Sequence, residues 1–438
     1  SISTGYDIDN SLKFEADNNE SLSKTLSSDG NKQTWTVSCW VKRTELANQM
    51  IFAAQDTYLY FVDNKIRINT RNDLTNYFFE TAALFRDTSA WYHCVVAVDT
   101  TNSTASERTR VYVNGVEYSS TNTTYTNNSY GTRWNDSTRT QRIGKYDTGI
   151  NFSGYLAEFH SIDGQQLAPT DFGEYDDDSG IWKPKAYTGS YGSKGFYLDF
   201  SDSANLGDDA SGNSNNFTEN NITAADQATD TPTNNGCTLN VLASLEGSND
   251  ITEGALVSTG KAGGGGNFNG TYGTIGIDPF NSSVDWYWEI ETSIGTSGST
   301  TDIGIGWIKE SRITSGSTIY SDVYGDGISR YSSQTANAAG DIWGVLLETG
   351  TTPVFKLYRN DSLIHTSTHG SGGVSFDTLM FPYITVKGTS VDARLNFLNP
   401  ASSFSIASGN ADPNGYGNFE FDPKGGYALC TKNLAEYG

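Results

Sequence analysis

Acidic side chains are the groups in this sequence whose types and spacing come closest to an ion-binding site. Two sets of aspartates lie in polar, turn-rich stretches: Asp176, Asp177, Asp178, Asp202, Asp208 and Asp209. Calcium is held by about six to eight oxygens, which loop carboxylates and backbone carbonyls can supply. Neither set has the spacing of an EF-hand loop. Calcium is therefore the cofactor that either set would hold, and a solvated acidic loop is the alternative for both.

A pair of glutamates has a spacing that suggests a glycosidase. Glu289 and Glu291 stand two residues apart in a strand-like stretch, which puts their α-carbons about 7 Å apart on one face. Retaining hydrolysis needs two carboxyl groups about 5–5.5 Å apart across a cleft, one of them with a raised pKa. Ile290 stands between the two glutamates, where a third acid would be expected. We therefore interpret both glutamates as solvated strand residues.

The remaining candidates for catalysis lack the arrangement that their chemistry needs. His365 and His369 have the interval of a zinc-binding helix, but Gly370 and Gly372 follow them, which indicates a loop. The glycine-rich segment 260–270 has its lysine before the glycines, so it lacks the lysine that grips phosphate after them. No Gly-x-Ser-x-Gly nucleophile motif occurs. The sequence thus predicts no catalytic residue and no enzymatic activity.

Aromatic side chains in a polar segment indicate binding instead of catalysis. Residues 121–142 place Tyr125, Tyr130 and Trp134 among asparagine, aspartate and arginine. Aromatic rings stack on the C–H faces of sugars, while amides and charged groups hold the hydroxyls. Two interpretations stay open: the three rings bind a glycan, or they pin the loop to its own domain.

Composition and charge restrict the fold and the partners. The 438 residues include 46 glycines, 25 tyrosines and 21 phenylalanines but only 2 methionines. Turn formers and strand formers thus dominate over helix formers, which predicts an all-β protein. A net charge of −23 repels phosphate backbones and anionic lipid heads. We expect no nucleic-acid partner and, without a long apolar run, no membrane insertion.

Strand signals fall into two series. In the first, residues 34–42 alternate between apolar and polar side chains, residues 91–99 are apolar on both faces, and Asn114-Gly115 predicts a hairpin turn. In the second, residues 286–292 and 380–386 are the clearest strands. The sequence predicts two jelly-roll-like β-sandwiches, with helix only in single turns such as residues 169–175.

A polar stretch separates the two series. Residues 201–236 are poor in aliphatic side chains and rich in asparagine, aspartate, serine and threonine, so they cannot bury a core of their own. We interpret 201–236 as a linker, either free or extended along a domain surface. This interpretation places the domains at residues 1–200 and 237–438.

Four cysteines are too few and too dispersed for a disulfide framework. Cys39 and Cys94 are expected close together on strands of one sheet. Cys237 and Cys430 stand in the similar segments CTLN and CTKN at the two ends of the second half, where chain ends often meet. We expect them on paired strands and reduced.

Sequence segments in both halves resemble known families. WTVSCWVKR, WYHCVVAVDTT, RVYVNGVE, RIGKYD and FSGYLAEFHSIDGQQL resemble the laminin-G-like, concanavalin A-like sandwich family, and the resemblance covers roughly residues 10–165. Such domains commonly bind carbohydrates or proteins, sometimes through calcium. WYWEIE, DIGIGWI, DIWGVLLE and FKLYRNDSLI resemble the SPRY family, although Asn360-Asp361 replaces its usual Asn-Gly turn. The SPRY resemblance implies binding of proteins or peptides and no catalytic residues.

The connecting segments resemble a third group. FGEYDDDSGIWKPKAYTGSYGSKGFYLDFSDSANLGDDASGN, TDTPTNNGCTLNVL and GGYALCTKNLAEYG are similar to segments of structural proteins of marine tailed bacteriophages. The resemblance implies a non-enzymatic tail fibre, head fibre or other appendage on the virion exterior. Its expected partners are other virion proteins and a host-surface glycan or protein, with the chain as a homo-oligomer. Two alternatives stay open: a capsid-surface decoration protein without a receptor role, and a secreted adhesin or glycan-binding module at a cell surface.

Overall fold

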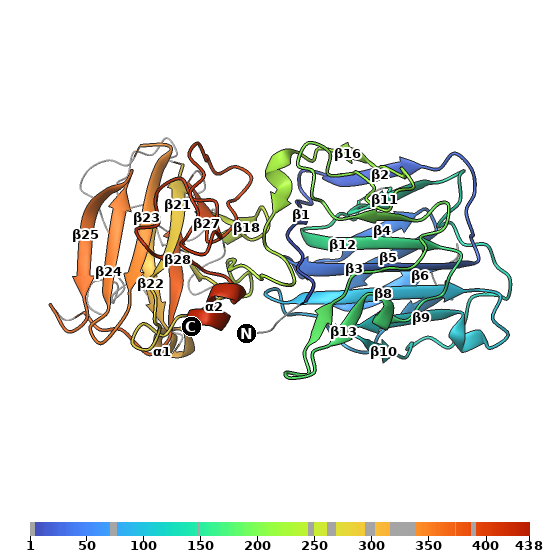
Figure 1. Ribbon diagram of the computed structural model, residues 1–438, viewed down its shortest axis with the longest axis horizontal. Coiled ribbons are helices and arrows are strands. Elements are labelled where there is room, and N and C mark those ends of the chain that lie inside the picture. The colour runs from blue at the N-terminus through green and yellow to red at the C-terminus, as the bar shows by residue number, and fades with distance from the viewer. Residues whose placement is uncertain are drawn as a thin grey trace. The chain divides into compact units, whose positions relative to one another are not determined.

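The computed structural model describes residues 5–70, 77–147, 149–243, 249–260, 269–293, 303–315, 338–372, 374–386 and 391–438. The chain divides into two compact units, residues 2–233 and residues 234–438, which we call the N-terminal unit and the C-terminal unit. Figure 1 shows that both are built from strands, as predicted for an all-β protein. Each unit is described by itself.

Two main sheets make up most of the described part of the N-terminal unit. The first has the order β10 (Val116–Tyr118), β9 (Thr109–Val113), β8 (Trp91–Asp99), β3 (Thr34–Arg43), β12 (Gly154–Asp163), β1 (Ser11–Phe14) and β17 (Gln227–Ala228), and β15 (Phe196–Leu198) pairs with β12. The second has the order β16 (Thr218–Asn220), β2 (Ser21–Thr25), β11 (Thr140–Ile143), β4 (Gln49–Ala54), β5 (Thr57–Val62), β6 (Lys65–Asn69) and β7 (Phe78–Glu80). They are the eight-stranded sheet and the seven-stranded sheet of this unit.

Short elements complete the N-terminal unit. β13 (Gly173–Tyr175) and β14 (Trp182–Pro184) form a separate hairpin. Single 3-10 turns cover Ala105–Glu107, Pro169–Asp171 and Ala224–Asp226. The predicted helical turn at residues 169–175 is right for Pro169–Asp171 and wrong for residues 173–175, which form β13.

Alternating side chains explain how the sheets of the N-terminal unit face each other. On β3, Trp35, Val37, Cys39 and Val41 point into one shared core, as their spacing predicts. Residues of the seven-stranded sheet, for example Leu59 on β5, belong to the same core. The confirmed fold is therefore a β-sandwich.

The interpretation of residues 201–236 as a linker is wrong for residues 201–233. Leu206, Phe217 and Ile222 are buried in the core of the N-terminal unit. β16 pairs with β2, and β17 pairs with β1. Composition misled because this segment needs no core of its own: a few spaced apolar side chains enter an existing core, and short strands extend existing sheets.

The C-terminal unit also has two main sheets among its described residues. The larger has the order β18 (Asn249–Thr252), β19 (Val257–Gly260), β27 (Asp392–Asn396), β21 (Trp286–Thr292), β23 (Asp341–Glu348), β24 (Val354–Arg359) and β25 (Ser362–Thr368), and β28 (Tyr427–Ala428) pairs with β21. The smaller has the order β20 (Asn269–Tyr272), β26 (Met380–Val386) and β22 (Ile303–Lys309). Two short helices, α1 (Glu310–Ser315) and α2 (Thr431–Tyr437), accompany them. Neither has the length or apolar character needed to cross a bilayer within the described chain.

The cysteine predictions are largely confirmed. Cys39 on β3 lies directly opposite Cys94 on β8. Gly236 forms a bridge with Cys430, and the Cys237 N–H donates to the Leu429 carbonyl at 2.9 Å. All four cysteines are buried and unbonded to each other. The predicted strand pairing stops at Cys430, because the rest of the CTKN segment begins helix α2.

Candidate functional site

The outer face of the seven-stranded sheet carries three tyrosines. On β5, Leu59 and Phe61 point into the core, so Tyr58 and Tyr60 point outward. Tyr146, from the loop after β11, joins them: the ring centroid of Tyr58 is 5.3 Å from that of Tyr60 and 5.2 Å from that of Tyr146. We call Tyr58, Tyr60 and Tyr146 the tyrosine cluster.

Charged pairs flank the tyrosine cluster on the same face. Arg142 on β11 forms an ion pair with Asp147 at 2.5 Å. On the other side, Arg67 lies opposite Tyr60, and its Nε donates to Glu80 at 2.8 Å. An aromatic surface with planar polar groups beside it is the usual composition of a site that orients a hydroxylated ligand.

Asp56 stands at the turn between β4 and β5, next to the tyrosine cluster. Its Oδ2 lies 3.9 Å from the Nε of Arg133. Burial raises the pKa of Asp56, while the charges of Arg133 and Arg139 act in the opposite direction. Burial is also the main cause of the raised pKa of Tyr58, to which the negative charge of Asp56 adds. The charge of Asp56 therefore interacts both with the two arginines and with Tyr58.

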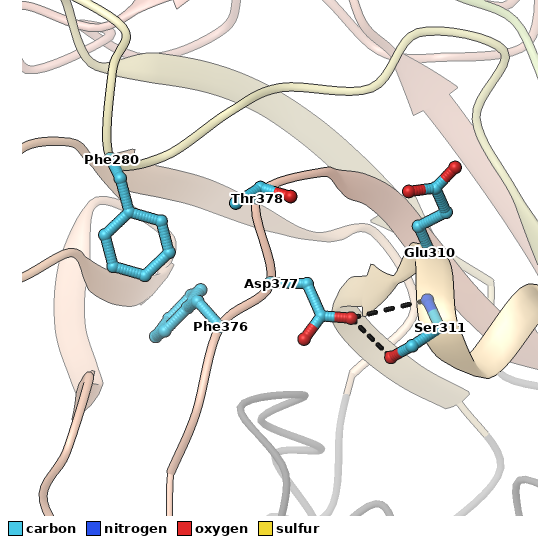
Figure 2. Close-up of a pocket in the computed structure, with 6 residues that line it drawn as sticks. All are labelled: Phe280, Glu310, Ser311, Phe376, Asp377 and Thr378. Carbon is cyan, nitrogen blue, oxygen red and sulfur yellow. Dashed lines mark hydrogen bonds between the residues drawn. The ribbon is translucent and has the colours of Figure 1, made fainter.

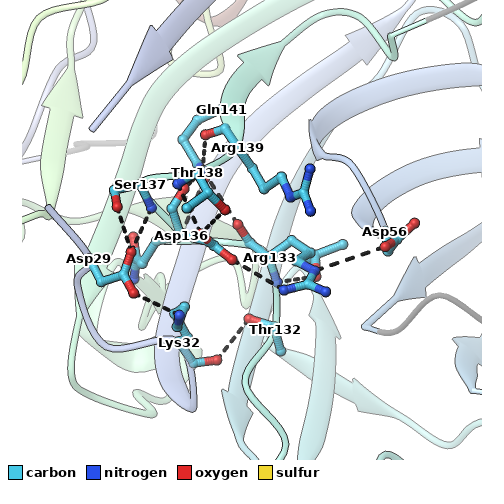
Figure 3. Close-up of polar contacts among 12 residues, drawn as sticks. Asp29, Lys32, Asp56, Thr132, Arg133, Asp136, Ser137, Thr138, Arg139 and Gln141 are labelled. Atoms are coloured by element: carbon cyan, nitrogen blue, oxygen red, sulfur yellow. Dashed lines mark hydrogen bonds and ion pairs between the residues drawn. The ribbon is translucent and has the colours of Figure 1, made fainter. Parts of the chain in front are cut away.

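The loop before β11 holds the side chain of Arg133 in place. Asp136 accepts hydrogen bonds from the backbone N–H and the hydroxyl of Thr138, at 2.9 Å and 2.6 Å, and from Arg133 at 3.2 Å. Figure 3 shows the side chains of Arg133 and Arg139 on the side of this loop that faces Asp56. Because the Arg133 guanidinium is already held by Asp136, a ligand would bind it at a small cost in side-chain entropy.

The structure separates the three rings that the sequence predicted as one glycan site. Trp134 is 0% exposed: its ring lies 4.6 Å from Phe52, and its Nε1 donates to the Ser161 hydroxyl at 3.0 Å. A ring enclosed in the core cannot stack on a ligand, so the glycan-binding role of Trp134 is wrong, and the alternative of a ring that pins the loop is right. Tyr125 is 40% exposed and Tyr130 is half-buried, and their role stays a prediction.

Asp176 and Asp209 serve the fold of their own loops. Asp176 accepts hydrogen bonds from the Ser179 backbone and hydroxyl, both at 2.9 Å, and pairs with Lys183 at 3.1 Å. The hydrogen bonds from Ser179, followed by Lys183, lower the pKa of Asp176 to about 2. Asp209 accepts backbone N–H groups of Tyr197 at 2.9 Å and Asn215 at 2.7 Å. These oxygens are occupied by the chain itself.

The other predicted calcium ligands are exposed: Asp177, Asp178, Asp202 and Asp208. Within the described residues, no group of three or more acidic, histidine or cysteine side chains comes together in a way that could hold a metal ion. Neither aspartate set is therefore assembled as a calcium site.

The interpretation of Glu289 and Glu291 as solvated is wrong. Their exposed fractions are 0% and 3%. Glu289 accepts the backbone N–H groups of Glu420 at 2.8 Å and Phe421 at 2.9 Å. Glu291 pairs with Arg394 at 3.1 Å. Both carboxylates face the irregular C-terminal segment and hold it on β21, which a strand pattern alone does not reveal.

Burial raises the pKa of Glu289 from 4.5 to about 7, although its hydrogen bonds oppose the shift. The folded unit thus binds this proton more tightly than the unfolded chain, so the contribution of Glu289 to stability falls as pH rises between about 4.5 and 7. Glutamine does not titrate, so its free energy of unfolding lacks this pH dependence. We expect the difference in the free energy of unfolding between Glu289→Gln and the wild type to move in favour of the variant by up to about 3 kcal/mol as the pH rises from 4.5 to 8. Urea unfolding at several pH values measures this difference. A difference that is constant with pH would contradict the assignment.

The C-terminal unit has an open hollow of about 390 Å³ (Figure 2). Its described lining consists of Phe280, Glu310, Ser311, Phe376, Asp377 and Thr378. Asp377 accepts hydrogen bonds from the backbone N–H and the hydroxyl of Ser311. The Asp377 carboxylate is thus engaged in holding the start of α1. Because this polar group of the hollow already has a role in the fold, we place the candidate site on the N-terminal unit instead.

Sequence reasoning missed the tyrosine cluster and Asp56. The alternation TYLYFV (57–62) was the available signal, because tyrosines that alternate with Leu59 and Phe61 indicate a second, aromatic face of the strand. Tyr58 and Tyr60 are 7% and 8% exposed, so the half-buried Tyr146 is the ring of the cluster that solvent reaches most. Arg133, Arg139 and Tyr146 come from other segments, and only the fold brings them to Asp56.

Comparison with known families places this face in a defined class of domain. Residues 14–165 match the family model of the concanavalin A-like lectin/glucanases superfamily. This stretch forms a concanavalin A-like domain, and it contains the tyrosine cluster, Asp56 and both arginines. The C-terminal unit is a second β-sandwich.

Several solved structures are similar to the chain at low identity. A putative carbohydrate-binding protein from Bacteroides ovatus is 16% identical with a TM-score of 0.34; the match covers 49% of this chain and 59% of that one. The mouse laminin α1 chain domains LG4-5 are 11% identical with a TM-score of 0.28, covering 93% and 94%. A human SPRY domain is 12% identical with a TM-score of 0.24, covering 32% and 90%. No curated protein sequence matches the chain.

Proposed function

We propose that the N-terminal unit binds a glycan on the outer face of its seven-stranded sheet. The observation that carries this proposal is the tyrosine cluster beside Asp56, on a domain of the concanavalin A-like class. The half-buried ring of Tyr146 offers an aromatic surface to the C–H face of a sugar. Asp56 accepts hydrogen bonds from sugar hydroxyls, and Arg133 and Arg139 donate to ring or hydroxyl oxygens.

We further propose that this binding takes place without hydrolysis. On the proposed face, Asp56 Oδ2 lies 3.9 Å from the Nε of Arg133, and the charged side chains that act on Asp56 are Arg133 and Arg139, not a second carboxylate. Glycoside hydrolysis uses two carboxyl groups. The arrangement around Asp56 therefore supports recognition of a glycan over its hydrolysis.

The proposed setting is the exterior of a virus particle. It rests on the resemblance of the connecting segments to bacteriophage structural proteins, and it makes the chain an appendage whose glycan lies on the host surface. Other virion proteins and further copies of the chain are the proposed assembly partners. A decoration protein without a receptor role, or a secreted adhesin, would keep the same sandwiches. Immunogold labelling of purified virions tests the setting, and label confined to host cells would favour the adhesin.

Glycan binding is expected to require Tyr146 and Asp56. Wild-type protein is screened on an array of bacterial surface polysaccharides, and the bound glycan is then titrated calorimetrically. Tyr146→Ala removes the stacking surface, and Asp56→Asn removes a charged acceptor, so each is expected to weaken binding about tenfold or more.

Tyr125→Ala is the matched control, because Tyr125 is an exposed tyrosine of the same unit. It is expected to bind like the wild type. Loss of binding with Tyr125→Ala but not with Tyr146→Ala would move the site to the loop that the sequence first indicated. A wild-type protein that binds no glycan on the array would count against glycan recognition.

A further inference from the structure

The tyrosine cluster continues into an arginine on the neighbouring strand. Arg67 on β6 lies directly opposite Tyr60 on β5, and the central carbon of its guanidinium is 6.0 Å from the centroid of the Tyr60 ring. The ring of Tyr60 is 5.3 Å from that of Tyr58, which is 5.2 Å from that of Tyr146. We call Tyr146, Tyr58, Tyr60 and Arg67, which these contacts join in that order, the strip.

The register places the whole strip on the outer face of the seven-stranded sheet. Ile66 and Ile68 belong to the core, so Arg67 between them points outward, as Tyr58 and Tyr60 do on β5. The sheet order is β11-β4-β5-β6, and Tyr146 follows β11. Tyr146 and Arg67 therefore approach β5 from opposite sides, and the strip crosses the strands of the sheet.

Arg67 is ordered at its end of the strip. Its Nε donates to Glu80 at 2.8 Å, and its Nη1 donates to the Tyr60 hydroxyl at 3.3 Å. The guanidinium also lies over the ring of Phe78, with its central carbon 4.3 Å from the ring centroid. A planar guanidinium that is fixed in this way binds hydroxyl oxygens at a small cost in conformational entropy.

The solvent-accessible groups of the strip are at its two ends. Tyr58 and Tyr60 are nearly buried and form its base, whereas Tyr146 is half-buried and the Arg67 side chain is 23% exposed. The steps from Tyr146 to Arg67 are each close to the length that one sugar ring adds to a linear glycan chain. A single terminal sugar would therefore contact one end of the strip, and a chain of several sugars would contact both.

The cations at both ends of the strip are already engaged with carboxylates of the chain. Arg67 faces Glu80, and Arg142, beside Tyr146, faces Asp147. Neither arginine thus offers an unbalanced positive charge to an acidic sugar. The net charge of −23 repels an acidic polysaccharide as well.

We infer that the strip takes an internal stretch of a linear, uncharged glycan, with one part of the stretch on Tyr146 and another on Arg67. This inference rests on the proposed function and adds the class of ligand: a chain in place of a single terminal sugar. Asp56 and Tyr146 hold the first sugar. The guanidinium hydrogens of Arg67 that do not face Glu80 or Tyr60 donate to hydroxyls of a later sugar, so Arg67 determines the preference for length.

Fragments of different length test the inference. The polysaccharide that binds on the array is partially hydrolysed with acid, and its disaccharide and hexasaccharide fractions are titrated calorimetrically with the full chain. The wild type is expected to bind the hexasaccharide at least about tenfold more tightly, with little dependence on salt. Arg67→Gln is expected to weaken hexasaccharide binding about tenfold and to leave disaccharide binding unchanged, whereas Tyr146→Ala weakens both.

Arg110→Gln is the matched control, because Arg110 is a 33% exposed, ion-paired arginine on β9 of the other sheet. It should leave both affinities unchanged. Arg67→Lys keeps a charge beside Glu80 but lacks the planar fork, so it should also lose the preference for length, which provides a second test if Arg67→Gln fails to fold.

The outcomes separate this inference from the proposed function. Equal affinity of the wild type for both fractions, or a preference for length that both Arg67 variants keep, would overturn the inference and leave glycan binding standing. Hexasaccharide binding that falls steeply with added salt would overturn the uncharged class of ligand. A wild-type protein that binds no polysaccharide would remove the proposed function, and the inference with it.

Discussion

Replacing Trp134 with alanine is expected to lower the free energy of unfolding of the N-terminal unit by about 3–5 kcal/mol. The ring is fully buried, and it lies 4.6 Å from Phe52 and 6.4 Å from Trp35. Its removal opens a cavity between the two sheets and leaves the Ser161 hydroxyl without its indole donor. Both effects act on the folded state, so the loss should be among the largest for a single residue of this unit.

Chemical denaturation followed by tryptophan fluorescence and circular dichroism measures this loss. Tyr125→Ala, in the same polar segment but exposed, is expected to change the unfolding free energy by less than about 0.5 kcal/mol. A Trp134→Ala protein that keeps wild-type stability but fails to bind glycan would restore Trp134 as a ligand contact and contradict its structural role.

Asp230→Ala is expected to destabilise the N-terminal unit by about 3–5 kcal/mol. Asp230 Oδ2 lies 2.7 Å from Lys42 Nζ, and the exposed fractions of these side chains are 3% and 0%. Asp230 Oδ1 accepts a hydrogen bond from Trp91 Nε1 at 3.0 Å. Alanine would leave the Lys42 ammonium buried without its carboxylate, and burying an uncompensated charge is costly.

The double variant Lys42→Met with Asp230→Leu distinguishes the loss of stability caused by an unpaired buried charge from the loss caused by missing side-chain packing. Removing both charges is expected to recover much of the stability that Asp230→Ala loses, because a buried ion pair can be replaced by apolar side chains at little cost. Thermal and urea unfolding of the three proteins provide the comparison. Wild-type stability of Asp230→Ala would contradict the placement of residues 201–233 within the unit, and would favour the linker interpretation.

The sandwich architecture could be predicted because the signals of its strands are local in the sequence. Apolar and polar residues alternate on β3, and β8 is apolar on both faces. Both patterns show which faces of the strand are buried, and both can be seen in consecutive residues. Residues 201–233 were misread for the opposite reason. Leu206 and Phe217 are isolated in sequence, and their burial depends on a core that other segments build.

The candidate site could not be predicted from sequence to the same degree. Tyr58 and Asp56 are neighbours in the chain, but Arg133 and Tyr146 reach them through loops that leave the sheet and return. In the polar segment 121–142, the neighbouring residues did not indicate which aromatic side chains point into the core: Trp134 does, and Tyr125 does not. Burial of Glu289 likewise depends on Glu420 and its neighbours, which are distant in sequence.

The places where the chain enters and leaves the sheets of the C-terminal unit lie side by side. The Asn235 N–H donates to the Thr431 hydroxyl at 2.9 Å, and the Thr431 N–H donates to the Asn235 carbonyl at 3.0 Å. A module whose two ends meet can be spliced into a surface loop of a foreign scaffold without pulling that loop apart, and it tolerates circular permutation. The C-terminal unit therefore has the geometry of a domain that can be inserted within another protein chain, as well as joined to the end of one.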